Sequence, residues 1–281
     1  MTTETRVAEH YTRGKLEEAV LRAITQSGKD ASRLGFADLA TMDEFHVGGL
    51  EATKSVATRM ELHPGLRLID VGSGIGGPAR YFAAEHNCNV VGIDLTEEFV
   101  QVASSLTRLV KLGHLAEFRH ASALEMPFAS ETFDRAYMMH VGMNIADKAG
   151  VFREVRRVLK NDGIFAVFDI LRTDVNGSLR YPLPWAMTEE TSFVSEIKDY
   201  REALERAGFR IVQERNQRQF AIDFTRKAAS RMASDGPPVL GLQLLMGDKT
   251  PQMLKNVLTL MEENVLEPVE LYARAVPRSP Q

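Results

Sequence analysis

Residues 68–77 read Leu-Ile-Asp-Val-Gly-Ser-Gly-Ile-Gly-Gly, an apolar stretch that ends in an acid and continues through four glycines. This order predicts a buried strand followed by a loop that brings its backbone close to a ligand. Glycines permit the tight turn, and the helix that follows offers free N–H groups. Two interpretations fit: a dinucleotide pattern, G-x-G-x-x-G, beginning at Gly72, and an adenosyl-sulfonium pattern, D-x-G-x-G-x-G, beginning at Asp70.

The charge of Asp70 separates these two ligands. A dinucleotide carries a pyrophosphate anion, which a carboxylate two residues before the first glycine would repel. S-adenosylmethionine has no phosphate and carries a sulfonium and an ammonium group, which the same carboxylate stabilises. Asp70 can also cap N–H groups of the loop, and this role is compatible with binding a cationic ligand. The sequence therefore favours the adenosyl sulfonium.

A second acid follows the next predicted strand. Residues 89–93 read Asn-Val-Val-Gly-Ile and lead to Asp94, 22 residues after Gly72. An acid about 20 residues beyond a glycine loop reaches the ribose hydroxyls of an adenosine ligand. A turn-forming role is the alternative for an acid directly after a strand, but the spacing favours the ribose.

Strands and helices alternate along the chain, which is typical of a parallel sheet with helices on both faces. We expect strands near 67–71, 89–93, 116–120, 134–139, 164–169, 210–217 and 269–275. Helices are expected near 76–86, 97–112, 147–159 and 196–207. Because doubly wound sheets bind ligands beyond the carboxyl ends of their strands, the functional loops should follow residues 71, 94, 120, 139 and 169.

Two helical regions are expected outside this core. The predicted organisation is an N-terminal helical cap (1–60), a ligand-binding core (61–221), a helical lid insertion (222–266), and the last core strand with a tail (267–281). The cap contains an amphipathic helix whose apolar face would carry Leu16, Val20, Leu21 and Ile24. The insertion is rich in methionine and leucine, which usually pack as core, although a role in lining a substrate site is the alternative.

The composition indicates a soluble enzyme with one large core plus a cap. The chain has 281 residues, of which 44% are hydrophobic, and a formal net charge of −4, which argues against a nucleic-acid partner. The single cysteine, Cys88, excludes an internal disulfide and fits a reducing, cytoplasmic compartment. No apolar run approaches the roughly 18 residues of a membrane span.

The chain resembles the class I S-adenosylmethionine-dependent methyltransferases. Beyond the two motifs above, residues 121–128 read Ala-Ser-Ala-Leu-Glu-Met-Pro-Phe, Phe133-Asp134 opens the next strand, and residues 154–163 lead through a turn into another. This ordered set is more specific than any single motif. Within the family, the chain is similar to enzymes that methylate sarcosine and dimethylglycine, tocopherols or natural products. The resemblance implies a doubly wound, Rossmann-like α/β fold with seven mostly parallel strands and a helical lid.

The resemblance also implies which residues border the cofactor. They are Asp70, Gly72, Ser73, Gly74, Gly76, Asp94, Leu95, Ser122, Ala123, Leu124 and Met139. One position departs from the family, which commonly has an acid five residues before the Pro-Phe pair to hold the adenine amino group. This chain has Ser122 there, and a neutral hydroxyl accepts the same hydrogen bond more weakly.

His140 is the candidate catalytic residue. It follows the strand near 134–139, so it should lie at the carboxyl end of the sheet, beside the methyl group, as a base for the acceptor's proton. The alternative is a histidine that hydrogen-bonds the cofactor or the loop and transfers no proton. Related sugar O-methyltransferases place a histidine a few residues later, where this chain has Met143-Asn144, so their base has no counterpart here.

Three ring side chains are candidates for substrate binding. Tyr181 and Trp185 follow the fifth strand in a proline-rich segment, where they would form an aromatic wall that stabilises a developing cation. His46 lies beside glycines in a turn that would cover the cofactor. Packing of the segment or turn is the alternative for each residue. The remaining histidines show no metal-ligand spacing, so we expect no metal.

We therefore expect an S-adenosylmethionine-dependent methyltransferase that transfers a methyl group to nitrogen, oxygen or activated carbon of a small molecule by in-line displacement. The alternatives are a nicotinamide-dependent oxidoreductase on the same class of fold and a non-catalytic module that binds an adenosyl ligand. The expected partner is the small-molecule acceptor, with no nucleic acid and no membrane span. Oligomeric state stays open, with a homodimer as one candidate.

Overall fold

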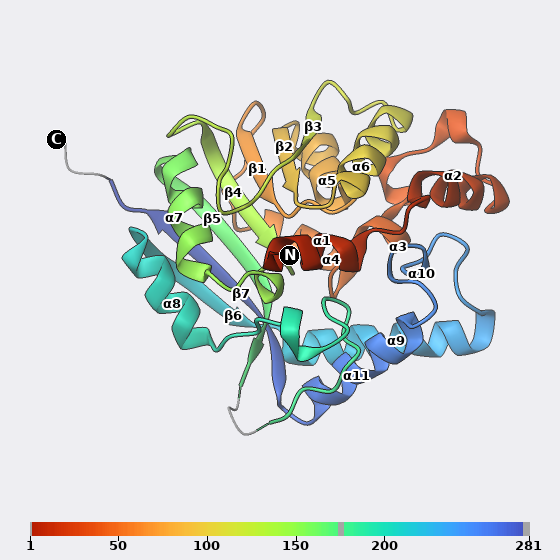
Figure 1. Cartoon of the computed structure of the whole chain (residues 1–281). Helices are drawn as coiled ribbons and strands as arrows, with labels where there is room; N and C mark the ends of the chain where they lie inside the picture. The colour runs from red at the N-terminus through yellow and green to blue at the C-terminus, as the bar shows by residue number, and fades with distance from the viewer. Residues whose placement is uncertain (1, 174–176, 278–281) are drawn as a thin grey trace.

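The computed structural model describes residues 2–173 and 177–277 and has a seven-stranded sheet at its centre (Figure 1). The strands are β1 (Arg67–Val71), β2 (Asn89–Asp94), β3 (Ala116–His120), β4 (Phe133–Met139), β5 (Leu159–Arg172), β6 (Phe209–Asn216) and β7 (Leu266–Ala275). Their order is β3-β2-β1-β4-β5-β7-β6, and only β7 runs antiparallel to its neighbours. The predicted doubly wound, mostly parallel sheet is confirmed. Of the predicted tail, residues 278–281 lie outside the described residues.

Helices cover both faces of the sheet, which explains the continuous apolar runs in its central strands. α4 (Gly49–Ala57) and α5 (Gly77–His86) pack on one face, where they bury Leu68 and Phe168. α7 (Lys148–Val158) and α8 (Ile197–Arg206) pack on the other face, where they bury Ile69 and Val167. Neighbouring residues of one strand therefore enter opposite layers of the core. α6 (Glu97–Leu109) packs on β2 and β3.

The structure differs from the sequence prediction at two places. Leu16, Val20 and Ile24 are buried along α2 (Leu16–Gln26), but Leu21 is 40% exposed. The prediction for Leu21 is wrong. The buried residues recur at every fourth position, and Leu21 directly follows buried Val20, so its side chain points about 100° away around the helix, toward solvent. The second difference is that β5 begins at Leu159, ahead of the strand predicted from 164. The turn predicted there corresponds to an irregularity in the register of β5 against β4, where Asp162 has a φ angle of 60°.

The cap and the lid lie on the same edge of the sheet (Figure 1). The cap contains α1 (Thr3–Tyr11), α2 and α3 (Ala40–Asp43), and the lid contains α9 (Arg218–Asp235), α10 (Gln243–Met246) and α11 (Thr250–Glu262). α9 packs against α11. The lid helix begins at Arg218, earlier than the predicted boundary at 222. Among the described residues, no helix combines the length and the apolar character that crossing a membrane requires.

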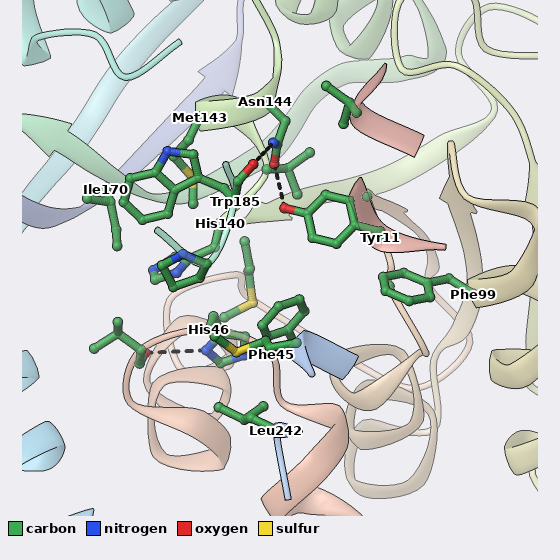
Figure 2. Close-up of a pocket in the computed structure, with 18 of the residues that line it drawn as sticks. Tyr11, Phe45, His46, Phe99, His140, Met143, Asn144, Ile170, Trp185 and Leu242 are labelled. Atoms are coloured by element: carbon green, nitrogen blue, oxygen red, sulfur yellow. Dashed lines mark hydrogen bonds between the residues drawn. The ribbon is translucent and has the colours of Figure 1, made fainter. Parts of the chain in front are cut away.

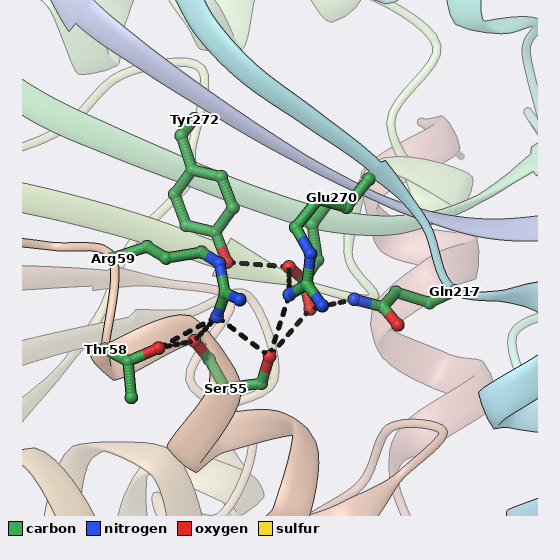
Figure 3. A network of polar contacts seen from close by, with 7 residues as sticks. Ser55, Thr58, Arg59, Gln217, Glu270 and Tyr272 are labelled. Atoms are coloured by element: carbon green, nitrogen blue, oxygen red, sulfur yellow. Dashed lines mark hydrogen bonds and ion pairs between the residues drawn. The ribbon is translucent and has the colours of Figure 1, made fainter.

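A buried polar network ties the start of the lid to α4 and to the sheet (Figure 3). The Glu270 carboxylate on β7 is 1% exposed and accepts hydrogen bonds from Gln217 at 2.8 Å and from the Tyr272 hydroxyl at 2.8 Å. Arg215 of β6 pairs with the same carboxylate at 2.8 Å, and Ser55 of α4 donates to it at 3.3 Å. Because Gln217 is the N-cap residue of α9, this carboxylate fixes the start of the lid.

Candidate active site

A cavity of about 750 Å³ lies at the carboxyl ends of β1, β2 and β4, at the edge that the topology predicts. The strand ends and the glycine loop line one side, and α1 with residues 43–47 lines another. The lid contributes mostly small or apolar side chains, namely Ala228, Ala229, Met232, Leu242, Met246 and Leu254. Figure 2 shows rings from the cap and from the core around the same space.

The glycine loop brings its backbone to this cavity. Gly72 and Gly74 both have positive φ angles, 76° and 52°, which favour glycine. A Cβ on Gly72 would lie 2.4 Å from Val141 Cγ2, so no side chain fits there. A Cβ on Gly74 would meet no atom within 4 Å, and Gly74 lines the cavity. Gly74 therefore leaves room for a ligand against the backbone.

Asp94 at the end of β2 holds this loop in place. Its Oδ2 accepts a hydrogen bond from Gly74 N–H at 2.8 Å, and its Oδ1 accepts one from Thr96 N–H at 2.8 Å. Burial raises the pKa of Asp94, and these two hydrogen bonds partly oppose that shift. Each carboxylate oxygen accepts more than one hydrogen bond, so Asp94 keeps capacity for ligand hydroxyls.

Asp70 at the end of β1 lacks a partner on one of its oxygens. It is 2% exposed and lines the cavity, and its Oδ2 makes no well-formed hydrogen bond among the described residues, although the Tyr137 hydroxyl of β4 lies near enough to oppose part of the rise in its pKa. Burial raises the pKa of Asp70 well above its ordinary value. A cation bound beside it would favour the ionised carboxylate. Because a buried acceptor without a partner is costly, this oxygen fits the cationic group of a ligand.

His140 directly follows β4 with its backbone in the left-handed region, at φ 57°, which is uncommon outside glycine. Its N–H donates to the Phe168 carbonyl at 2.7 Å. The ring lines the cavity, and its buried Nε2 has no hydrogen-bond partner among residues 2–173 and 177–277. Burial, together with the nearby His46, holds the pKa of His140 well below its usual range. The ring is therefore neutral at pH 7, and its Nε2 makes no hydrogen bond within the described residues.

The Asp169 carboxylate of β5 fixes the loop after His140. It accepts hydrogen bonds from Val141 N–H at 2.9 Å, Gly142 N–H at 3.0 Å and the Tyr200 hydroxyl at 2.8 Å. Burial raises the pKa of Asp169 to about 7. A Cβ on Gly142 would lie 2.3 Å from Asp169 Oδ2, so this close approach requires glycine. Asp169 thus acts on the site through the position of the loop.

His46 also lines the cavity, but the protein already engages its ring. His46 Nε2 lies 2.9 Å from Glu44 Oε2 and 3.1 Å from Thr53 Oγ1. The Thr53 hydroxyl donates to the same Glu44 oxygen at 2.6 Å, and all three side chains are buried. The predicted glycine-flanked turn around His46 is therefore held by α4.

A chain of hydrogen bonds joins the cap to Trp185 (Figure 2). The Tyr11 hydroxyl of α1 donates to Asn144 Oδ1 at 2.9 Å, and Asn144 Nδ2 donates to the Trp185 carbonyl at 2.9 Å. The Trp185 indole N–H donates to Ser192 Oγ at 2.9 Å, and its ring is 1% exposed while lining the cavity. Trp185 is both a loop anchor and part of the wall.

Most of the predicted residues lie around this one cavity. Its lining includes His46, Asp70, Gly72, Ser73, Gly74, Asp94, Leu95, Ala123, Leu124, Met139, His140 and Trp185. Gly76, Ser122 and Tyr181 are not part of the lining. Gly76 is the N-cap of α5 and packs against Phe118. The Ser122 hydroxyl donates to Glu4. Tyr181 packs in the same apolar cluster as Trp185 but does not reach the cavity, so the predicted aromatic wall contains Trp185 and not Tyr181.

α1 also lines the cavity, which the sequence motifs did not predict. Glu4, Val7 and Tyr11 all line the cavity. Their spacing of three and four residues places them on one face of a helix, and this spacing is the feature of the sequence from which a lining role could have been predicted. Phe45 and Phe99 also line the cavity next to Tyr11. Among the described residues, no group of three or more His, Cys, Asp or Glu side chains is placed to hold a metal ion.

Comparisons with known proteins agree with this geometry. A family model described as a methyltransferase domain matches residues 69–167. The sterol 24-C-methyltransferase erg6 of Aspergillus fumigatus is 33% identical over 119 residues, which are 42% of this chain and 32% of that protein. The chain spans about a third of the length of the curated relatives that it matches.

Two solved structures share the whole fold. The 4+2 cyclase SpnF is 21% identical with a TM-score of 0.69, covering 99% of this chain and 98% of that one. Phosphoethanolamine N-methyltransferase 2 of Haemonchus contortus, in complex with S-adenosyl-L-methionine, is 18% identical with a TM-score of 0.76, covering 97% and 60%. Residues 69–167 therefore match a methyltransferase domain, and the chain is similar in sequence to methyltransferases and in fold to a structure solved with S-adenosyl-L-methionine.

Proposed function

We propose that this protein transfers a methyl group from S-adenosylmethionine to an apolar small molecule that binds under the lid. The observation that carries this proposal is the buried, unpartnered Asp70 Oδ2 beside the glycine loop. A nicotinamide dinucleotide would bring a pyrophosphate toward this carboxylate, whereas S-adenosylmethionine brings cations. The charge of Asp70 therefore supports the adenosyl sulfonium over the dinucleotide.

The residues that would hold the cofactor follow the order of the strands. Asp70, at the end of β1, would bind the ammonium group, and Asp94, at the end of β2, would bind the ribose hydroxyls. Ala123 and Leu124, after β3, would border the base. When bound, the sulfonium supplies an activated methyl group, so the acceptor needs no protein nucleophile. What the chain must provide is alignment of the acceptor and exclusion of water.

The acceptor is proposed to be apolar because the remaining cavity wall is apolar. Phe99, Ile170 and Trp185 line the core side, Phe45 adds a ring from the cap, and the lid adds methionine and leucine side chains. Burial of a hydrocarbon skeleton against such a wall contributes about 25 cal/mol per Å². The name of the sterol 24-C-methyltransferase relative indicates an acceptor with this character. Lys255 also lines the cavity and would suit an anionic group at one end of the acceptor.

His140 would accept the proton that a nitrogen or oxygen nucleophile loses. Its Nε2 is buried and unpartnered, and the ring is neutral at pH 7. A lowered pKa makes the ring a weak base, so its contribution depends on its position next to the acceptor atom. For a carbon nucleophile, the same ring would pack against the substrate, or would accept the proton that the carbon skeleton loses after the methyl group is transferred.

The test uses S-adenosylmethionine with a labelled methyl group. The protein is incubated with matched panels of apolar acceptors (sterols, prenyl diphosphates, long-chain phenols and amines) and short polar acceptors (sarcosine, ethanolamine phosphate, catechol). We expect label to enter members of the apolar panel. Label that enters only the polar panel would contradict the proposed acceptor class.

A lid variant and a matched control sharpen this test. Met232→Glu places a carboxylate in the apolar wall and should weaken acceptor binding while leaving S-adenosylhomocysteine affinity unchanged. Met187→Glu makes the same change at an exposed residue outside the cavity lining and should alter neither. If S-adenosylhomocysteine binds but no acceptor is methylated, the site acts as an adenosyl-binding module. Binding of NADH without S-adenosylhomocysteine would indicate the oxidoreductase.

We propose a small-molecule acceptor as the principal partner, without nucleic acid, and a cytoplasmic location. The formal net charge of −4 supports the first part. Cys88 is free and buried, which suits a reducing compartment. Fractionation of cells and light scattering of the purified protein test the location and a homodimeric state.

A further inference from the structure

We propose that Glu4 of α1 accepts a hydrogen bond from the amino group of the cofactor's adenine, so that the N-terminal helix completes the cofactor site. The inference rests on the proposed function, because it requires an adenosyl ligand in the cavity. The proposal gives a role in cofactor binding to α1, which precedes the first strand of the sheet by more than fifty residues of sequence. In Figure 1, α1 crosses in front of the carboxyl edge of the sheet.

A short hydrogen-bonded chain connects Glu4 to the loop after β3. The Ser122 hydroxyl donates to Glu4 Oε1 at 2.5 Å, and the same hydroxyl accepts from Leu124 N–H at 3.0 Å. The proton of Ser122 is thus already used, and Ser122 is not part of the cavity lining. Glu4 does line the cavity. The serine therefore positions the carboxylate, and the carboxylate faces the ligand space.

The order of the strands places the adenine end of the ligand beside Glu4. β2 lies between β1 and β3, and Asp94 is in register with His120 at the ends of β2 and β3. Ala121 N–H donates to the Asp94 carbonyl at 3.1 Å, so the loop after β3 begins next to the ribose acid. A base attached to a ribose on Asp94 must extend over this loop, where Leu124 and Glu4 line the cavity.

Glu4 has a carboxylate oxygen without a protein partner, whereas both oxygens of the other two cavity carboxylates at this end have one. Asp94 accepts from Gly74 and Thr96, and Asp147 accepts from Gly150 N–H as the N-cap of α7 and pairs with Arg153 at 3.7 Å. Glu4 Oε2 has no hydrogen bond to any residue in the described ranges, and Glu4 forms no ion pair with them. An amino group that donates to this oxygen would form a charge-assisted hydrogen bond.

α1 is held firmly enough to present Glu4. Thr2 caps the helix by accepting from Thr5 N–H at 3.1 Å. After the helix, the Glu98 carboxylate of α6 accepts from Gly14 N–H at 3.0 Å and Leu16 N–H at 2.9 Å. The Tyr11 hydroxyl bonds to Asn144 at the far end of the helix. The Thr2 cap supports the first turn of the helix, and the contacts of Tyr11 and Glu98 fix its C-terminal end to the rest of the fold.

The experiment measures a coupling between Glu4 and the 6-amino group by calorimetry. Wild type, Glu4→Ala and Glu4→Gln are titrated with S-adenosylhomocysteine and with the analogue in which hydrogen replaces the 6-amino group. We expect wild type to prefer the amino ligand by about tenfold or more, and Glu4→Ala to lose most of this preference. Glu9→Ala is the matched control, because Glu9 is an exposed acid of the same helix outside the cavity lining.

A rescue variant separates a direct contact from loss of the helix. Ser122→Asp in the Glu4→Ala background moves the acid from α1 to the loop after β3. This variant should restore the preference for the amino ligand to within about threefold of wild type. If Glu4→Ala keeps the preference for the amino ligand, or if Glu9→Ala loses it equally, the role of Glu4 is overturned while the proposed function still stands. If wild type binds no S-adenosylhomocysteine, the proposed function fails first and this assignment fails with it.

Discussion

The His140 ring lies edge-on to the His46 ring, with 5.9 Å between their centroids. His46 Nε2 is engaged by Glu44 and Thr53, whereas His140 Nε2 has no partner among the described residues. Both rings line the same cavity. One histidine is thus committed to the protein and the other is available to a ligand, which directs the test of proton transfer to His140.

Substitution of His140 should slow methyl transfer to a nitrogen or oxygen acceptor. We expect His140→Asn to lower kcat about 100-fold if the ring accepts the proton. Asparagine tolerates the left-handed backbone at this position better than most residues, so the loop should be preserved. The measurement is turnover at saturating cofactor, with His63→Asn, an exposed site outside the cavity lining, as control. An unchanged kcat would assign His140 to binding or packing.

The lowered pKa of His140 predicts that the protein loses stability in acid. The folded pKa is below the unfolded value of about 6.5, so the unfolded chain binds more protons as pH falls through this range. Relative to His140→Asn, wild type should therefore lose up to about 1.4 kcal/mol of unfolding free energy per pH unit below about 6.5. Urea unfolding of both proteins from about pH 8 to about pH 5 checks this. Parallel curves for the two proteins would refute it.

Substitution of Asp94 should weaken the cofactor through its ribose. Asp94→Asn is expected to reduce the affinity for S-adenosylhomocysteine by about 1 to 3 kcal/mol, because a charge-assisted bond becomes neutral. Asp248→Asn makes the same change at an exposed lid residue and should have no effect. Calorimetry with an analogue that lacks the ribose hydroxyls separates the causes. If Asp94→Asn weakens that analogue equally, the loss comes from the glycine loop, which Asp94 also holds.

Substitution of Glu270 should destabilise the protein far from the cavity. Glu270→Gln removes the charge that pairs with Arg215. It also replaces one of the two oxygens, which accept separately from Gln217 and Tyr272, with an NH2 donor, so we expect a loss of about 2 to 4 kcal/mol. Glu263→Gln changes a surface partner of Arg180 and should cost less than about 1 kcal/mol. Urea unfolding compares the two variants. Equal losses would show that the buried network contributes no more than a surface pair.

Much of the sheet follows from local pattern. β1, β2 and β4 each contain an apolar run with Asp70, Asp94 or His140 at or next to its carboxyl end, and parallel strands bring these ends to one edge. The glycine loop and the acid spacing predict an adenosyl ligand for the same reason. Leu21 shows where such a prediction fails, because the hydrophobicity of a single residue does not determine which side of a helix it occupies.

The sequence by itself determined the fold class, the glycine loop and the two acids that point to the methyl donor. The tertiary structure alone decided which distant segments complete the cavity. Glu4 and Tyr11 reach it across more than a hundred residues of sequence, to Ser122 and Asn144. Local spacing encodes strands, turns and helix faces, but such contacts depend on how whole elements pack against each other. In the proposed cofactor site, Glu4 of α1 supplies the acid that position 122 lacks, and only the packed fold brings α1 to the loop after β3.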